Sequence, residues 1–173
     1  MLKNLNLAPV ALLILMMLGQ SSIYAQQQRG PSTAQERQAA VAMATSLEND
    51  PLGKKAKDYR KELFMWLVQV PDIEVIICTE MLGDPKKLKG DYSSELSTQQ
   101  MFSQAKFIIE HPEQAKDQQQ VYLAGIEGVL RAYNAIKGAK PKVKSEALED
   151  LLAKQQAGQL GEHVKNSMGK CKS

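Results

Sequence analysis

The sequence is poor in the residues that most often carry chemistry in proteins. Its 173 residues include two cysteines, two histidines and one tryptophan. A metal site needs more ligands than two scattered cysteines and two scattered histidines supply. The chain has no CxxCH motif for covalent haem and no GxSxG motif of serine hydrolases. The sequence therefore predicts no metal, no cofactor and no catalytic residues, which favours a protein that is not an enzyme.

Other catalytic patterns are also missing. The glycines of GIEG (125–128) and LGEHV (160–164) lack the spacing and the preceding strand of phosphate-binding loops. Acidic residues are scattered singly apart from Glu149 and Asp150, so no paired-carboxylate hydrolase is indicated. We interpret His163 as a surface residue and His111, just before Pro112, as a helix-junction residue. The remaining enzymatic alternative is a site assembled from residues distant in sequence.

The chain lacks a strong charge of either sign. It carries 22 Lys and Arg, one of them Lys3, against 19 Asp and Glu. Two basic clusters, KKLKG (86–90) and KGAKPKVK (137–144), contain glycine or proline and predict solvated loops. So small a net charge, without a long cationic run, gives no basis for binding nucleic acid.

A long hydrophobic run occurs only at the beginning of the chain. Lys3 precedes LAPVALLILMMLG (7–19), and SSIYA ends at the small residue Ala25. A basic start, an apolar stretch and a small final residue are typical of a secretory signal peptide, here residues 1–25. The run is shorter than the roughly 20 residues of a membrane span, so no stable membrane insertion is expected after removal of the signal. We predict a periplasmic or secreted protein with a flexible N-terminus at 26–32 and one helical domain at 33–173.

The export signal decides how the two cysteines are interpreted. Exported chains fold in an oxidising compartment, where two cysteines usually pair. A Cys78–Cys171 disulfide would close a loop of about 94 residues and contribute on the order of 4 to 5 kcal/mol by the chain-entropy model. A nucleophilic Cys78 would need a nearby base, and its apolar neighbours supply none.

The pattern of apolar residues and helix caps predicts an all-α, single-domain bundle of six or seven helices with one disulfide. Thr33 and Glu36 form a capping-box signature, Asp50 precedes Pro51 at a second start, and Ser145 is a third cap. Proline and glycine mark the stops. The predicted helices span residues 33–47, 50–70, 72–82, 94–110, 112–137, 145–156 and 160–168.

The segment DIEVIICTEML (72–82) allows two structural interpretations, a strand or a short helix. Its β-branched run favours a strand. Its apolar residues recur at helical spacing, with Asp72 as a possible cap and Gly83 as a stop, and no other segment offers a strand to pair with. We therefore predict a short helix that carries Cys78 near its apolar face.

The helix at 112–137 carries two adjoining stripes. Large residues such as Tyr122 and Ile126 form one, and small residues form the other: Gly125, Gly128, Ala132 and Ala135. Since a glycine inside a helix costs roughly 1 kcal/mol relative to alanine, close packing of another helix against Gly125, Gly128 and Ala132 is the expected compensation. The alternative is a small-residue face that holds a flat ligand.

Three segments in order, ICTEML (77–82), YLAGIEGVLRAY (122–133) and HVKNSMGKC (163–171), together resemble the exported immunity proteins that neutralise type VI secretion amidase toxins. The resemblance spans roughly residues 73–171 and implies a small, helical, disulfide-bonded periplasmic protein that plugs a toxin's active site. The additional cysteines of that family are absent between Cys78 and Cys171. We expect an exported interaction protein of the cell envelope with a protein partner, inhibitor-like or immunity-like. The alternative is a carrier of a small apolar ligand with a pocket beside the central helix.

Overall fold

A computed structural model describes residues 29–83 and 92–171 of the chain. These residues contain six α-helices and three short 3-10 helices, and no strand occurs among them. The prediction of an all-α domain with one disulfide is confirmed. The predicted signal peptide, residues 1–25, and the basic cluster at 86–90 lie outside the described residues.

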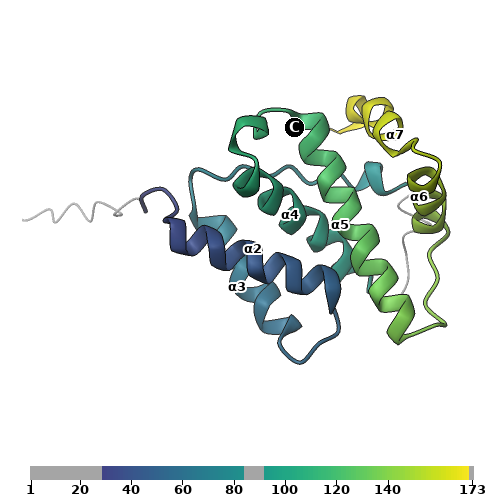
Figure 1. The fold of residues 1–173 in the computed structure, drawn as a ribbon, viewed down its shortest axis with the longest axis horizontal. Helices are drawn as coiled ribbons and strands as arrows, with labels where there is room; N and C mark the ends of the chain where they lie inside the picture. Colours follow the sequence, from purple (N-terminus) through teal and green to yellow (C-terminus); the bar gives the residue numbers. More distant parts are fainter. Residues whose placement is uncertain (1–28, 84–91, 172–173) are drawn as a thin grey trace, which may run out of the picture.

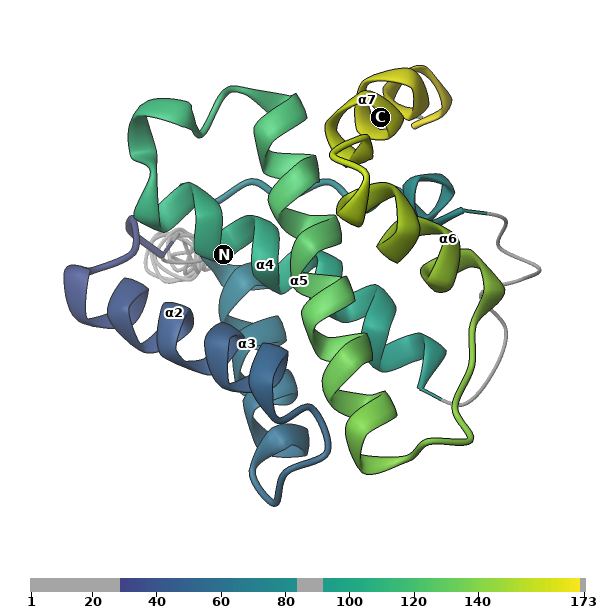
Figure 2. The same ribbon diagram turned by 45° about the vertical axis from the view of Figure 1, so that its right-hand side comes forward.

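The α-helices are α2 (Ala34–Asn49), α3 (Ala56–Gln69), α4 (Ser93–Glu110), α5 (Gln118–Ala139), α6 (Glu146–Gln156) and α7 (Leu160–Ser167), and the 3-10 helices are η1 (Thr79–Leu82), η2 (Pro112–Gln114) and η3 (Met168–Lys170). In Figures 1 and 2, α5 runs through the middle of the molecule, and α4 crosses it. Helices α2 and α3 lie on one side of α5, and α6 and α7 lie on the other. None of the described helices is both long and apolar enough to cross a membrane.

The apolar stripe of α5 lies in the core. Ile126, Val129 and Tyr133 are fully buried there, together with residues of η1, α6 and α7. A second cluster of buried residues joins α2, α3 and α4. Helix α5 therefore lies at the centre of the first cluster and packs directly against α2, α4, α6 and α7.

Two of the predicted caps form the expected hydrogen bonds. The Glu36 amide donates to Thr33 Oγ1 (3.2 Å), and the Thr33 amide donates to Glu36 Oε2 (2.7 Å), which completes the capping box of α2. The Leu148 amide donates to Ser145 Oγ at the start of α6 (3.4 Å). Short polar side chains at these positions satisfy amides that have no partner in the first helical turn.

The predicted starts of two helices are wrong. Asp50 ends α2, where its amide donates to the Ser46 carbonyl (2.8 Å), and α3 begins only at Ala56. A turn that includes Gly53 separates the two helices, since glycine after Pro51 favours a turn. Similarly, Pro112, the predicted start of the helix at 112–137, opens only η2, and α5 begins at Gln118 behind its cap Asp117.

The segment at 72–82 is not the predicted helix. Residues 73–78 have no regular secondary structure, Val70 and Cys78 have extended backbone, and only η1 is helical. Side chains of α4 take the place of a partner strand. Gln104 Oε1 accepts from the Ile76 amide (3.1 Å), and Gln104 Nε2 donates to the Ile76 carbonyl (3.0 Å). Gln100 Nε2 donates to the Cys78 carbonyl (3.2 Å).

Asp72 does not cap a helix but holds the beginning of the domain. Its carboxylate accepts from the Ser32 amide (2.9 Å), from Ser32 Oγ (2.8 Å) and from Arg37 Nη2 (2.7 Å). Burial raises the pKa of Asp72, but these donors outweigh burial and lower its pKa to about 2. Of the predicted flexible stretch 26–32, residues 29–32 are described, and Ser32 is fixed by these bonds.

Candidate functional site

The two cysteines form the predicted disulfide. Cys78 and Cys171 are bonded, with their Cα atoms 5.4 Å apart. The bond ties the non-helical segment 70–78 to the residue that follows η3. Both cysteines of the chain are consumed by it, so neither sulfur is available as a nucleophile or a metal ligand.

The small residues of α5 lie against α4. A Cβ atom at Gly125 would be 2.9 Å from Gln104 Cγ, and one at Gly128 would be 1.8 Å from Ser103 Oγ. Ala132 is also fully buried. Because α4 covers the glycine face, this face has no room for the flat ligand considered as an alternative.

A buried carboxylate at the end of α2 is not evident from the sequence. Glu48 is 2 % exposed and accepts hydrogen bonds from three side chains. The donors are Ser103 Oγ (2.8 Å), Lys106 Nζ (3.1 Å) and Arg131, whose Nε and Nη2 lie 3.0 and 3.1 Å away. Glu127, one turn earlier on α5, also faces Arg131, and its Oε2 lies 3.9 Å from Arg131 Nη1. The closer pairing with Glu48 joins residues 83 positions apart, which no local pattern reveals.

The charge of Glu48 is structural. Burial raises its pKa, but the hydrogen bonds from Arg131 and Ser103 outweigh burial, and its pKa lies below the ordinary value. The carboxylate is therefore ionised at neutral pH and holds α2, α4 and α5 together. Because its carboxylate is buried and already accepts from Ser103, Lys106 and Arg131, Glu48 is no candidate for a general base.

The two histidines lie far apart in the fold. His163 is half-buried rather than on the surface, and its Nε2 lies 3.0 Å from the Met81 carbonyl, which links α7 to η1. His111 ends α4, and its ring centroid lies 4.8 Å from that of Phe107. Within residues 29–83 and 92–171, no three His, Cys, Asp or Glu side chains are grouped so that they could hold a metal ion.

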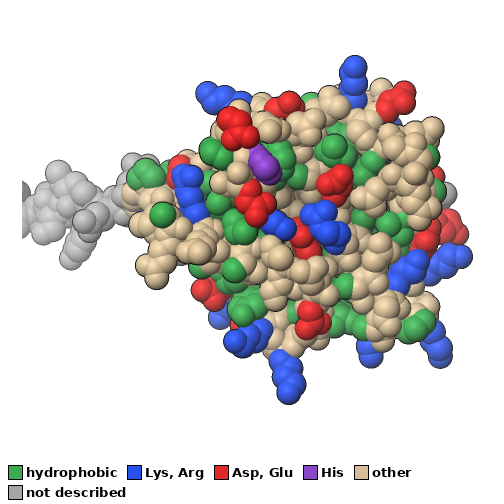
Figure 3. Space-filling model, viewed as in Figure 1, with side chains coloured by type: hydrophobic (Ala, Val, Ile, Leu, Met, Phe, Trp, Pro, Cys, Tyr) green, Lys and Arg blue, Asp and Glu red, His purple; other side chains and the backbone are tan. Residues whose placement is uncertain are grey.

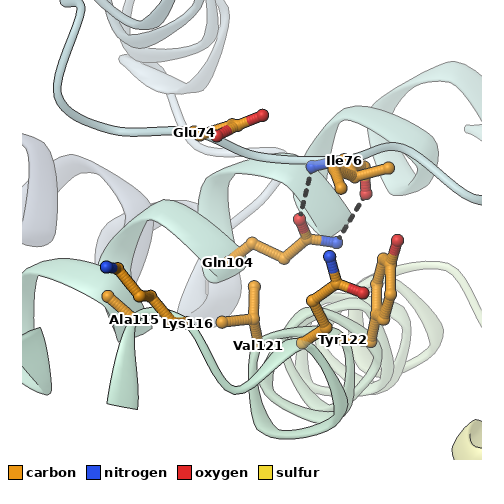
Figure 4. Close-up of a pocket in the computed structure, with 8 residues that line it drawn as sticks. Glu74, Ile76, Gln104, Ala115, Lys116, Val121 and Tyr122 are labelled. Atoms are coloured by element: carbon orange, nitrogen blue, oxygen red, sulfur yellow. Dashed lines mark hydrogen bonds between the residues drawn. The ribbon is translucent and has the colours of Figure 1, made fainter. Parts of the chain in front are cut away.

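A pocket of about 210 Å³ opens between the segment 70–78 and the start of α5 (Figure 4). We call it the α5 pocket. It is lined by Glu74, Ile76, Gln104, Ala115, Lys116, Gln118, Val121 and Tyr122. Gln104 is one of its walls, and both polar atoms of its amide are already bonded to Ile76.

Tyr122 contributes an unused polar group to the α5 pocket. The residue is 4 % exposed, and its hydroxyl has no hydrogen-bond partner within the part of the chain that the structure describes. Burial raises the pKa of Tyr122, so the hydroxyl stays protonated at neutral pH and can both donate and accept. The hydroxyl is not among the fully buried polar atoms that lack a partner in the described part of the chain, so it reaches solvent and can bond to water or to a ligand.

A larger, open groove of about 500 Å³ lies between α3 and α4. We call it the α3–α4 groove. Its lining residues are Lys57, Arg60, Lys61, Phe64, Met65, Ser94, Glu95, Thr98 and Phe102. Only three of the 14 residues of α3 are fully buried, so this helix leaves one long face without a covering element among the described residues.

The α3–α4 groove combines apolar and basic side chains. Phe64 is 44 % exposed and Met65 48 % exposed, and Val68, one turn further, is 68 % exposed. Arg60 Nε is buried and has no hydrogen-bond partner among the described residues. Burial lowers the pKa of Arg60, and Glu95 partly offsets this effect.

Comparisons with known proteins identify no relative. No protein-family model matches the chain, and neither the curated proteins nor the solved structures include a match. The function is therefore inferred from the geometry of the groove and of the pocket.

Proposed function

We propose that this protein is an exported binding protein that docks a protein partner in the α3–α4 groove and is not an enzyme. The exposure of Phe64, Met65 and Val68 on one side of α3 is the observation that carries the proposal. A soluble protein gains by burying large apolar side chains, and a contiguous apolar patch beside a groove is typical of an interaction surface.

The charges around the groove indicate the chemistry of the partner. Lys57, Arg60 and Lys61 face it from α3, whereas Glu95 is its one acidic lining residue. An amphipathic helix that inserts apolar side chains and carries acidic residues along its edge would complement both properties. Its carboxylates would pair with the exposed Lys57 and Lys61 at the edge of the groove.

Export is part of the same proposal. We infer that residues 1–25 direct the chain out of the cytoplasm and that the mature protein is periplasmic or secreted. The disulfide supports this inference because such bonds persist in oxidising compartments. Intact mass spectrometry of the protein purified from its native host would find a chain that begins near residue 26. A mature chain that retains residues 1–25 would contradict export.

The resemblance to exported immunity proteins names one class of partner, a toxin or enzyme whose active site the protein would block. The layout of the three segments supports this class, and the groove would be the surface that receives part of the toxin. The partner identified by the following experiment decides between an inhibitor and another envelope interaction.

Photo-crosslinking in cells tests the groove. A photoreactive phenylalanine analogue at Met65 is expected to give a discrete adduct, whereas the same analogue at Lys142, an exposed loop position after α5, is expected to give none. The double variant Lys57→Glu/Lys61→Glu should abolish the adduct, because charge reversal repels an acidic partner. The matched control Lys140→Glu/Lys142→Glu changes the net charge equally and should retain it. An adduct from Met65 that survives charge reversal of the groove would contradict the proposal.

The α5 pocket favours a second candidate, a carrier of a small ligand. The pocket lies beside the central helix, as that alternative requires, and Tyr122 offers an unused hydroxyl. Its volume of about 210 Å³ is below that of most drug-sized sites, and Glu74 and Lys116 add charges to its lining. A carrier function would therefore involve a ligand that is small and partly polar rather than purely apolar.

A further inference from the structure

We propose that the α5 pocket binds a free aliphatic α-amino acid, with the side chain inside and the ammonium and carboxylate groups at the rim. This site is separate from the α3–α4 groove, and the two share no lining residue, although α4 contributes to both. A result that contradicts the protein partner would therefore not contradict this inference, and the reverse also holds.

The inner part of the α5 pocket suits a branched apolar side chain. Ile76, Ala115, Val121 and the ring of Tyr122 supply apolar walls, and Ile76 and Val121 flank the pocket in Figure 4. An apolar cavity of about 150 Å³ accommodates benzene, so a pocket of about 210 Å³ has room for the side chain of leucine or valine. The volume excludes a long acyl chain.

The rim of the pocket carries both charges that a zwitterion needs. Figure 4 shows Glu74 on the non-helical segment and Lys116 on the loop before α5, on different sides of the pocket. Glu74 would accept from the ammonium group, and Lys116 would pair with the carboxylate. The Tyr122 hydroxyl, which has no partner among the described residues, lies at the end of the pocket opposite Lys116 in Figure 4, where it can bond to a water beside the ligand.

The pocket is held in shape without a ligand. Both bonds of the Gln104 amide fix Ile76, and the disulfide fixes the end of the same segment at Cys78. A preformed pocket loses little conformational entropy on binding, so a few hydrogen bonds suffice for measurable affinity.

Titration of the disulfide-intact mature protein with leucine, followed by amide chemical shifts, tests the inference. Leucine is expected to give saturable shifts at Ile76 and Val121. 4-Methylpentanoic acid, which lacks the ammonium group, and isoamylamine, which lacks the carboxylate, are expected to bind about tenfold more weakly or worse, because each leaves one rim charge unpaired.

Three variants with melting temperatures near that of the parent complete the test. Glu74→Gln should weaken leucine binding about tenfold, and Lys116→Gln should weaken it to a similar extent. Glu113→Gln removes an exposed carboxylate outside the pocket and should leave the affinity unchanged. The inference is overturned if leucine gives no saturable shift up to about 20 mM. It is equally overturned if the acid, the amine and leucine bind alike and Glu74→Gln has no effect.

Discussion

At the residue scale, Gly128 shows what the small stripe of α5 does. A Cβ atom there would lie 1.8 Å from Ser103 Oγ and 2.3 Å from Ser103 Cβ. Ser103 is itself fixed by its bond to Glu48, so it cannot move aside without disturbing the buried carboxylate. The lower helix propensity of glycine at this position is therefore outweighed by the close approach of α4.

We expect Gly128→Ala to destabilise the protein by about 1–3 kcal/mol, the usual cost of overpacking, although alanine favours helix. The melting temperature should fall by roughly 3–10 °C. Gly138→Ala in the same helix is the control, since nothing lies within 4 Å of its Cβ position, and it should be neutral or stabilising by about 0.5 kcal/mol. Thermal unfolding of both variants measures the difference, and an equal effect would contradict close packing at Gly128.

Glu48 makes the stability of the fold depend on pH. Because its pKa in the folded protein is below the ordinary value of 4.5, it contributes stability above that value and loses the contribution as the pH falls through its folded pKa. Glu48→Gln should cost about 1–3 kcal/mol at pH 7, as Arg131 and Lys106 then lack their anion. Urea unfolding at pH 7 and pH 3 should show that the difference in unfolding free energy between the parent and Glu48→Gln becomes smaller in acid. Glu62→Gln, a change at an exposed position, should be as stable as the parent at both pH values. A difference between the parent and Glu48→Gln that is the same at pH 7 and pH 3 would contradict a stabilising role of ionised Glu48.

At the scale of elements, the segment 70–78 shows how a chain can run extended without a sheet. Gln104 offers the Ile76 backbone an acceptor and a donor in the arrangement that a neighbouring strand would provide. A side-chain amide can do this because it carries both groups. The segment therefore depends on α4 rather than on its own propensity.

We expect Gln104→Ala to destabilise the protein by about 1–3 kcal/mol, since the amide and carbonyl of Ile76 lose their partners. Hydrogen exchange at the Ile76 amide should accelerate about tenfold or more. Gln155→Ala, at an exposed position of α6, should change neither property. Unchanged exchange at Ile76 in Gln104→Ala would show that the amide bonds do not hold the segment.

Local patterns predicted most elements but not their partners. The caps at Thr33 and Ser145 were predictable because a cap acts within three residues of its own position. The helical reading of 72–82 is wrong because the spacing of its apolar residues carries no information on Gln100 and Gln104, which lie about 25 residues further along. The starts at Asp50 and Pro112 are wrong because proline and an acid suit a tight turn as well as a helix.

The candidate sites were less predictable than the fold. Exposure of Phe64 and Met65 depends on which face of α3 packs on the core, and their spacing alone indicates core residues. Likewise, Glu74, Lys116 and Tyr122 meet at the α5 pocket only because the segment 70–78 runs past the start of α5. The disulfide and the close packing at Gly125 and Gly128 could be inferred in advance, since two cysteines leave a single pairing and glycines inside a helix indicate close packing.

At the scale of the whole molecule, the disulfide closes a loop with a sequence separation of 93. Most of the core, including α4, α5, α6 and α7, lies within this loop. By the chain-entropy model, a loop of about this length stabilises the fold by on the order of 4 to 5 kcal/mol.

The double variant Cys78→Ser/Cys171→Ser should therefore melt about 10 °C or more below the parent. The parent treated with a reductant should melt at the same temperature as the variant. Addition of the reductant to the variant is the control and should change nothing. A melting temperature that is insensitive to both treatments would show that the native helices hold together without the bond.

The position of the disulfide also determines how the molecule would respond to mechanical force. A pull on the two ends of the domain passes from Cys78 directly to Cys171 through the covalent bond, and the residues between them bear no tension. Only α2, α3 and the segment leading to Cys78 would unravel under such a load. A domain tethered at its ends would thus lengthen by less than half of its contour while α4, α5, α6 and α7 stayed folded.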